Sequence, residues 1–291
     1  MRFFALSVVF FLSLVISGLV SGNDINTSSI TLHTDDHNLT SRINQPHAPF
    51  SASVDTAQLL VDALGYDKPI LEVSLKRSFQ QIENGESVCV INKIKSAERE
   101  KKYTFSLPLN FFQTQQLYQL ASLVPLASSL LNDNDEVVSI HKALDTYETS
   151  AIVLPETYSY GERVDKDLRN IDEKQIITLS NPTFFARFMT IISAGKADFA
   201  LIFPASLYQA FGDSMPVKMR SYNIADNPTF VSGHVICGKT PEALAFIDRV
   251  NVAIKSIYVN PVFIETHTKY LPAKSKPFIE QVIQQEVASL L

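Results

Sequence analysis

Residues Gly233–Thr240 read GHVICGKT and match the spacing G-x-x-x-x-G-K-[ST] of a phosphate-binding loop. Such a loop needs a flexible turn between its glycines and a helix that begins at the lysine. Here the intervening residues, His234–Cys237, are strand formers instead of turn formers. Pro241 is suited to the first helical position, so that Thr240 would cap a helix that begins after Lys239. We therefore interpret the stretch as a strand followed by a helix, and not as a nucleotide site.

Cys89 and Cys237 are the two cysteines of the chain. In an oxidising compartment two cysteines most simply form one disulfide, and two buried, unpaired thiols are the alternative. Because they lack the Cys-x-x-Cys spacing of metal sites, we expect no metal and no cofactor. The chain also has no G-x-S-x-G motif, which leaves a serine hydrolase without support.

The chain begins with the layout of a secretory signal peptide. A single Arg2 precedes an apolar run from Phe3 to about Val20, and small residues then lead to a cleavage site after Gly22. An uncleaved anchor is the alternative, because the run is nearly long enough to span a bilayer. We predict that residues 1–22 are removed and that the protein is periplasmic, an oxidising location in which a disulfide persists.

The composition indicates a globular protein of 291 residues, 46% of them hydrophobic. This length exceeds one typical compact core and suggests two lobes. The formal net charge of −5 argues against nucleic acid or an anionic membrane as a partner. We expect a monomer.

The elements that must position any site follow a β-α-β pattern twice. In the first unit we expect strands near 29–34, 69–75 and 87–94, and helices near 56–65, with Ser53 and Asp55 at its start, and near 76–85. Residues 35–53 are polar and are predicted to be a loop. The order β-α-β-α-β requires a parallel sheet with crossover helices.

The pattern then restarts. We expect strands near 117–126, 150–155, 175–180 and 197–203, with helices near 139–147, 160–170 and 182–195. Apolar stretches at 217–225 and 229–240 follow, and then two helices at 241–258 and 277–291. The sequence therefore predicts two α/β units that are joined by strands.

Several segments resemble the type II periplasmic solute-binding proteins, in the amino-acid-binding-like family 3 superfamily. The first-lobe pattern of these proteins is a helix that ends in Gly, a strand, a Thr/Ser-x-x-Arg turn and an aromatic-Ser-x-Pro segment. It is matched by Gly85, Cys89–Lys93, Ser96–Arg99 and Phe105–Pro108. The second-lobe pattern of a helix, Gly-x-x-Asp and a strand resembles Ile191–Phe203. The resemblance covers nearly all of the mature chain, and the order of the motifs is more specific than any one of them.

This resemblance implies a two-lobe α/β fold in which each lobe is a mostly parallel sheet flanked by helices, with hinge strands between. The implied division is 23–112 for the first part of lobe 1, 113–229 for lobe 2, and 230–291 for the return to lobe 1. The return strand would then lie beside the third strand. Cys89 and Cys237 would be cross-strand neighbours, close enough for a disulfide.

The resemblance places a ligand between the lobes, where strand ends and helix starts offer free N–H groups. Arg99 matches the arginine that holds a ligand carboxylate in these proteins, a task that suits the bidentate guanidinium. The alternative is a solvated charge, because residues 93–102 form a charge run. Asn92 and Lys93, at the end of the third strand, are further candidates, or else surface turn residues.

In lobe 2 the candidates are Tyr158, Ser159 and Tyr160, whose hydroxyl and backbone groups could bind an anion and whose rings could stack on a ligand. Ordinary turn and packing roles are the alternative. Amino-acid binders of this family place an acidic residue after the Gly-x-x-Asp strand, to hold the ligand ammonium. This sequence has Phe203 and Pro204 there, so a carboxylate or an aromatic ligand without an amino group is the better expectation.

The resemblance implies a non-enzymatic protein that captures a small polar or carboxylate-bearing solute for a membrane permease or sensor. One alternative is a dehydratase-like enzyme on the same fold, for which Glu156 is the candidate acid or base. Another is a scaffold that has lost its ligand.

Overall fold

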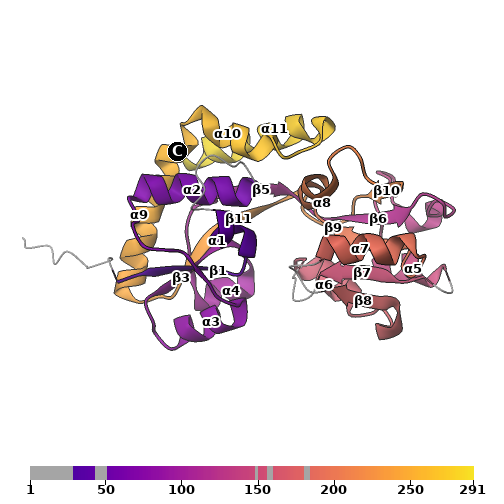
Figure 1. The fold of residues 1–291 in the computed structure, drawn as a ribbon, viewed down its shortest axis with the longest axis horizontal. Coiled ribbons are helices and arrows are strands. Elements are labelled where there is room, and N and C mark those ends of the chain that lie inside the picture. Colours follow the sequence, from indigo (N-terminus) through magenta and orange to yellow (C-terminus); the bar gives the residue numbers. More distant parts are fainter. Residues whose placement is uncertain (1–28, 43–50, 148–149, 156–159, 180–183) are drawn as a thin grey trace, which may run out of the picture.

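The computed structural model describes residues 29–42, 51–147, 150–155, 160–179 and 184–291, which build two α/β lobes side by side (Figure 1). Among the helices of these residues, none is both long and apolar enough to cross a membrane. The two-lobe α/β architecture predicted from the sequence is confirmed.

The sheet of the first lobe has the strand order β2-β1-β3-β11-β4, and β5 also pairs with β11. Strand β1 is parallel to β2 and β3, as the β-α-β pattern predicts, whereas β11 runs antiparallel to β3, β4 and β5. The sheet is therefore mixed. Its strands are β1 (Thr31–Thr34), β2 (Leu71–Glu72), β3 (Val88–Ile94), β4 (Thr104–Phe105), β5 (Asn110–Gln113) and β11 (Phe230–Cys237).

Helices cover both faces of this sheet (Figure 1). They are α1 (His37–Arg42), α2 (Ala52–Leu64), α3 (Leu75–Glu83), α4 (Ala97–Lys102), α9 (Pro241–Tyr258), α10 (Pro261–Thr268) and α11 (Lys276–Leu290). On β3, Cys89 and Ile91 pack into the core beneath α2 and α9, while Val88 and Val90 pack toward α3. A strand buried on both faces reads as a continuous apolar run, which is why β3 was recognisable in the sequence.

The sheet of the second lobe has the order β10-β6-β9-β7-β8. Strand β7 is parallel to β8 and β9, and β6 is antiparallel to β9 and β10. The strands are β6 (Gln116–Leu120), β7 (Ile152–Pro155), β8 (Ile176–Leu179), β9 (Phe199–Ile202) and β10 (Met219–Tyr222). The helices are α5 (Ile140–Asp145), α6 (Glu162–Leu168), α7 (Phe184–Ser193) and α8 (Pro204–Phe211), with three-residue 3-10 turns at η1 (Ser128–Leu130) and η2 (Glu173–Gln175).

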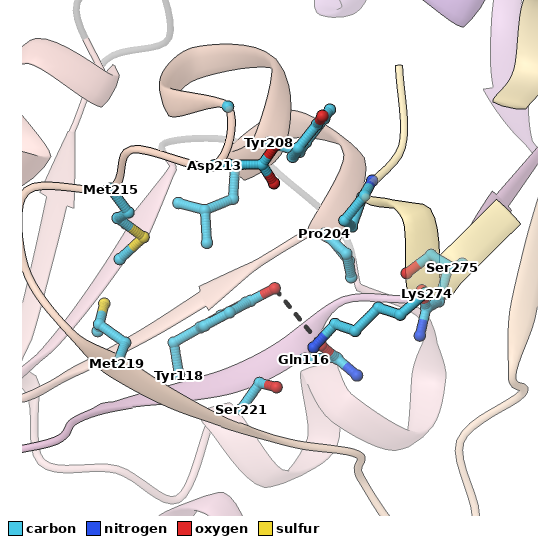
Figure 2. A pocket seen from close by; sticks show the side chains of 14 residues that line it. Gln116, Tyr118, Pro204, Tyr208, Asp213, Met215, Met219, Ser221, Lys274 and Ser275 are labelled. Carbon is cyan, nitrogen blue, oxygen red and sulfur yellow. Dashed lines mark hydrogen bonds between the residues drawn. The ribbon is translucent and has the colours of Figure 1, made fainter. Parts of the chain in front are cut away.

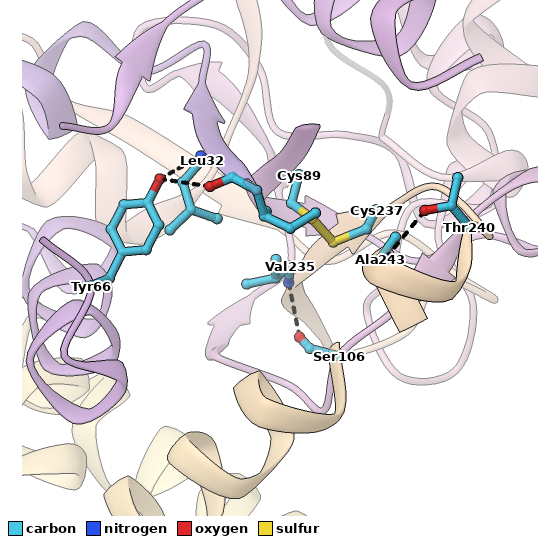
Figure 3. The surroundings of a disulfide bond; sticks show 9 residues. Leu32, Tyr66, Cys89, Ser106, Val235, Cys237, Thr240 and Ala243 are labelled. Carbon is cyan, nitrogen blue, oxygen red and sulfur yellow. Dashed lines mark hydrogen bonds between the residues drawn. A yellow bond between two sulfur atoms is a disulfide. The ribbon is translucent and has the colours of Figure 1, made fainter. Parts of the chain in front are cut away.

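The return strand lies where the resemblance implied. Ile236 of β11 is paired with Val90 of β3, and Cys237 with Cys89. The disulfide between Cys89 and Cys237 is confirmed, with a Cα–Cα distance of 4.3 Å, and both cysteines are fully buried (Figure 3). The bridge ties together two strands that are 148 residues apart in the chain.

Several local predictions need correction. Residues 35–53 are not all loop, because they contain α1 and the start of α2. The N-cap of α2 is Ser51, whose side chain accepts a hydrogen bond from the Val54 amide, and not Ser53. The strand expected over 69–75 is reduced to the two exposed residues of β2, and the strand expected over 117–126 ends at Leu120. Helices α1, α4, α8 and α10 were not predicted; each has only six or eight residues, and a single residue separates α8 from β9.

Candidate functional site

The edge of the first sheet at the carboxyl end of β3 carries a β-bulge. Ile91 and Asn92 together face the single residue Val235 of β11, and Asn92 has a left-handed backbone with φ of 58°. Asparagine tolerates this conformation better than most residues. A bulge changes the direction of the side chains at and after it, so the side chain of Asn92 does not follow the alternation between the two faces of the sheet.

A line of polar side chains runs from this bulge into the lobe. Asn92 Nδ2 donates to Ser53 Oγ at 3.0 Å, and Asn92 Oδ1 accepts from Asn110 Nδ2 at 3.1 Å. Asn110 Oδ1 in turn pairs with the hydroxyl of Thr56, and both of these residues are fully buried. The line fixes the first turn of α2 against the ends of β3 and β5, so the position of the Asn92 amide is set by packing.

Lys93, next to Asn92, forms an ion pair with Asp35, the residue that follows β1. Parallel strands end at the same sheet edge, which brings these two side chains together. The side chain of Lys93 is only 13% exposed. Asp36 lies beside the pair, and burial raises the pKa of its carboxyl. The edge thus holds one cation and two carboxyl groups.

Arg99 lies in the first turn of α4, behind the cap formed by Ser96 Oγ and the Arg99 amide. Its Nη1 donates to the carbonyl of Ile94 at 2.8 Å, and its guanidinium lies over the ring of Phe79 at 5.4 Å from the centroid. Burial lowers the pKa of this guanidinium from its ordinary value. Both contacts lie within the first lobe, and the first uses one of the five N–H groups of the side chain.

In the second lobe, the carboxyl ends of β7 and β9 lie at one edge. Tyr160 follows β7 and is buried; its backbone N–H donates to Asp165 Oδ1 at 2.8 Å, and its carbonyl accepts from Gln115 Nε2 at 2.7 Å. Phe203 follows β9 and is the N-cap of α8, to which its side chain gives no hydrogen bond. Tyr158, Ser159 and Glu156 lie outside the described residues.

Two chain segments connect the lobes, and they are bonded to each other. The amide of Thr114 donates to the carbonyl of Thr229 at 3.2 Å, and the Thr114 hydroxyl donates to the carbonyl of Pro228 at 2.7 Å. In Figure 1, α4 of the first lobe and α6 of the second lie on the facing sides of the two lobes. A paired, two-segment connection of this kind can act as a hinge between packed units.

The phosphate-loop match at Gly233–Thr240 is structural. Its first part lies in β11, and Thr240 caps α9 by accepting from the Ala243 amide at 3.3 Å. Lys239 Nζ donates to the carbonyls of Glu100 and Lys101, both at 2.9 Å. Its charge therefore neutralises the carboxyl end of α4 instead of a phosphate.

Two histidines, His33 and His37, stand four residues apart, a spacing that can indicate a metal site on a helix. Here His33 lies in β1, and its Nδ1 is 3.1 Å from Ser78 Oγ. His37 is the first residue of α1, and its Nδ1 is 2.9 Å from Glu72 Oε2. Within the described part of the chain, no group of three His, Cys, Asp or Glu side chains could hold a metal ion.

The sequence matches no protein-family model and no curated protein. Solved structures do match. The probable amino-acid ABC transporter extracellular-binding protein YtmK of Bacillus subtilis has a TM-score of 0.56 at 14% identity, over 84% of this chain and 98% of its own. The arginine-, lysine- and histidine-binding protein ArtJ of Geobacillus stearothermophilus has a TM-score of 0.56 at 16% identity, over 85% and 98%. An arginine transport system periplasmic binding protein of Legionella pneumophila has a TM-score of 0.54 at 15% identity, over 84% and 99%.

The chain has the two-lobe fold of periplasmic solute-binding proteins. At these identities the likeness establishes the fold, and the chemistry of the ligand must be argued from the residues of this chain. In this solute-binding fold, Asn92, Lys93 and the Arg99 contact to Ile94 share the edge of the first sheet. Tyr160 and Phe203 share the edge of the second.

The sequence did not point to Asp35, Ser53 or Asn110 as parts of this edge. Asp35 could have been found, because it directly follows a strand that was predicted. Ser53 and Asn110 could not have been found in this way, because they are 39 and 18 residues away from Asn92 in the chain and meet it only in the folded structure.

Proposed function

We propose that this protein is a non-enzymatic, exported solute-binding protein, which captures a small solute between its lobes and presents it to a membrane permease or sensor. The observation that carries the proposal is the fold, shared over 84–85% of this chain with proteins named as binding components of amino-acid transport systems. The polar sheet edge around Asn92 and the paired connection at Thr114 support it. Proteins of two lobes bind ligands at such edges and close around them.

We propose that the ligand carries a carboxylate. Arg99 brings a cation to the edge of the first lobe and can hold a carboxylate with the N–H groups that Ile94 does not use, whereas Lys93 is already paired with Asp35. Asn92 would add an amide, and Tyr158 and Ser159 would contact the ligand from the second lobe. The side chain of Tyr160 is packed in the core of that lobe instead.

The resemblance implies an acidic partner for an α-amino group directly after β9. Phe203 and Pro204, as N-cap and first residue of α8, occupy the position of the expected acid. Phe203 is half-buried and would offer a ring to the ligand instead. A polar or carboxylate-bearing solute without an amino group therefore fits better than a free amino acid.

The organisation of the chain belongs to the same proposal. The boundaries 23–112, 113–229 and 230–291 stay predictions, as do the monomeric state, the absence of a cofactor and export by a leader of residues 1–22, which lies outside the described residues. A periplasmic location agrees with the disulfide, because such bonds persist in oxidising compartments.

The test is a thermal-shift screen of small carboxylates, amines and amino acids on the mature protein. A carboxylate that raises the melting temperature, and that NMR finds unchanged after incubation, supports the proposal. Turnover of the compound would favour the enzyme alternative, with Glu156 as the first residue to replace. If no compound in the screen raises the melting temperature, a scaffold without a ligand is favoured.

Arg99→Ala should abolish the thermal shift from the best carboxylate. Arg77→Ala is the matched control, because Arg77 is an exposed arginine on the neighbouring helix α3. An equal response in wild type, Arg99→Ala and Arg77→Ala would show that the carboxylate anchor lies elsewhere.

A further inference from the structure

A second pocket lies between the lobes, away from the sheet edges described above. It has a volume of about 230 Å³ and lies between α8 and the 3-10 turn η4 (Ala273–Ser275) that precedes α11. In Figure 1, α11 lies on the other side of the connecting strands from α4 and α6. The pocket is therefore centred away from Asn92 and Arg99, and Pro204 is the residue of the second sheet edge that also lines it.

Both lobes contribute to the lining of this pocket. Lys274 and Ser275 come from the C-terminal segment that packs on the first lobe, whereas Gln116, Tyr118 and Leu207 belong to the second lobe. Figure 2 shows the side chain of Lys274 extending across the pocket toward Gln116 and Tyr118. The two lobes thus bring a cation and a polar wall to one cavity.

One end of the pocket is suited to an anion. Tyr118 is buried, and its hydroxyl donates to Gln116 Oε1 at 3.4 Å. This long hydrogen bond is weak and can be exchanged for one to a carboxylate. Lys274 supplies a positive charge at the same end, while Asp213 lies beside Tyr208 on the opposite side (Figure 2). A carboxylate would therefore face Lys274.

The rest of the pocket is suited to an apolar body with a hydrogen-bond donor. Leu207, Met215 and Met219 form an apolar wall, and methionine adapts to varied shapes. Gln113 contributes to the lining, and its Oε1 is a buried acceptor that has no hydrogen-bond partner among the described residues. A buried acceptor left in this way costs free energy, which a ligand N–H or O–H would recover.

We propose that this pocket is a second solute site, which takes a small carboxylate with an apolar tail and an amino or hydroxyl group on the carbon next to the carboxylate. Lys274 binds the carboxylate, Gln113 Oε1 accepts from the amino or hydroxyl group, and Leu207, Met215 and Met219 contact the tail. Because Lys274 comes from one lobe and the tail wall from the other, occupancy of the site depends on how the lobes are arranged.

The experiment follows the methyl groups of methionine by NMR in protein labelled with ¹³C-methyl-methionine. Met215 and Met219 line the pocket, whereas Met189 on α7 does not, and it serves as an internal control. The probes are L-leucine and 2-hydroxy-4-methylpentanoate, with 4-methylpentanoate lacking the donor and isopentylamine lacking the carboxylate. We expect saturable shifts of Met215 and Met219 with one or both of the first two probes, which also distinguishes an amino from a hydroxyl ligand.

4-Methylpentanoate, which lacks the amino or hydroxyl donor, should bind about tenfold more weakly than the first two probes. Isopentylamine, which lacks the carboxylate, should not bind. Lys274→Gln should weaken the carboxylate probes by at least about tenfold, since a charge-assisted hydrogen bond is lost. Lys276→Gln is the matched control, because Lys276 is two residues away and outside the lining. Gln113→Leu should remove the preference for a probe with a donor.

The proposal is overturned if the methyl resonances of Met215 and Met219 do not shift with any probe. It is also overturned if the wild type and Lys274→Gln bind the carboxylate probes equally well. Isopentylamine binding as well as the carboxylates would overturn the assignment of Lys274. The readout is local to the pocket, so Arg99→Ala should leave it unchanged. Failure of the proposed function and failure of this second site are therefore distinguishable.

Discussion

Asn92 and Gly233 lie on the neighbouring strands β3 and β11, and the amide oxygen of Asn92 occupies the space that a Cβ at position 233 would need. The same amide holds Ser53 and Asn110 in the polar line at the sheet edge. The glycine at 233 is therefore required by the position of a side chain on the next strand, and not by its own backbone conformation.

Gly233→Ala should push the Asn92 amide out of the polar line and destabilise the protein by about 1–3 kcal/mol, as overpacking does. The measurement is the free energy of unfolding in urea. The double variant Gly233→Ala/Asn92→Gly is the control, because glycine accepts the left-handed backbone at 92 and removes the obstructing amide. Its cost should be smaller than the sum of the two single costs. If Gly233→Ala is as stable as wild type, the packing argument is wrong.

Reduction of the disulfide should weaken the first lobe, since it closes a loop of 148 residues between Cys89 and Cys237. The double variant Cys89→Ala/Cys237→Ala should lose about 2–5 kcal/mol of unfolding free energy. In the presence of a phosphine reductant, the unfolding free energy of the wild type should approach that of the variant. The reductant should not change the unfolding free energy of the variant itself. Identical urea midpoints for oxidised and reduced wild type would contradict this prediction.

Stability should fall in mild acid because of His267. This side chain is buried on α10, where Nδ1 lies 2.7 Å from the carbonyl of Phe263 and Nε2 accepts from the Phe111 amide at 3.2 Å. Burial lowers the pKa of His267 from 6.5 to about 4. The folded state therefore favours the neutral ring, and the stabilisation is present above pH 6.5 and is lost as the pH falls toward 4.

The loss from this one group amounts to about 3 kcal/mol between the two pKa values. Unfolding free energies measured at a series of pH values check it. His33 and His234 also have pKa values lowered by burial and add in the same direction. His267→Gln should flatten the pH dependence whatever its stability at neutral pH. An unchanged slope in His267→Gln would refute the assignment.

Lys239→Met should lower the free energy of unfolding by less than about 1 kcal/mol, because the lysine only neutralises the exposed carboxyl end of α4. It should leave binding of a carboxylate ligand unchanged. Lys255→Met, an exposed lysine on α9, is the control for a general loss of charge. Binding of ATP by wild type that Lys239→Met abolishes would restore the phosphate-loop interpretation.

Much of the fold could be predicted because its strongest local patterns are also its most buried elements. The continuous apolar run of β3 and the periodic face of α9 predicted a strand and a helix in the correct places. The capping pair Thr240–Pro241 located the start of α9. By contrast, α1 and α4 are polar and have six residues each, so their stability depends on neighbours that the local sequence does not identify.

The candidate site was predictable only in part. Asn92 and Lys93 stand at the end of a recognisable strand, and such positions line ligand sites in open α/β sheets. Their partners Ser53 and Asp35 are 39 and 58 residues away in the chain. The direction of Arg99, toward Ile94 and Phe79, also follows from how α3 and α4 pack.

The sequence by itself determined the larger buried elements, such as β3 and α9, because these depend on local periodicity. The return strand and the pairing of Cys89 with Cys237 were implied by the resemblance to the solute-binding family. The tertiary structure alone decided which polar groups meet. A one-residue bulge at Asn92 changes where every following side chain points, and the pocket at Lys274 exists only because segments more than a hundred residues apart pack together. Register and packing are properties of the whole fold, and no local pattern encodes them.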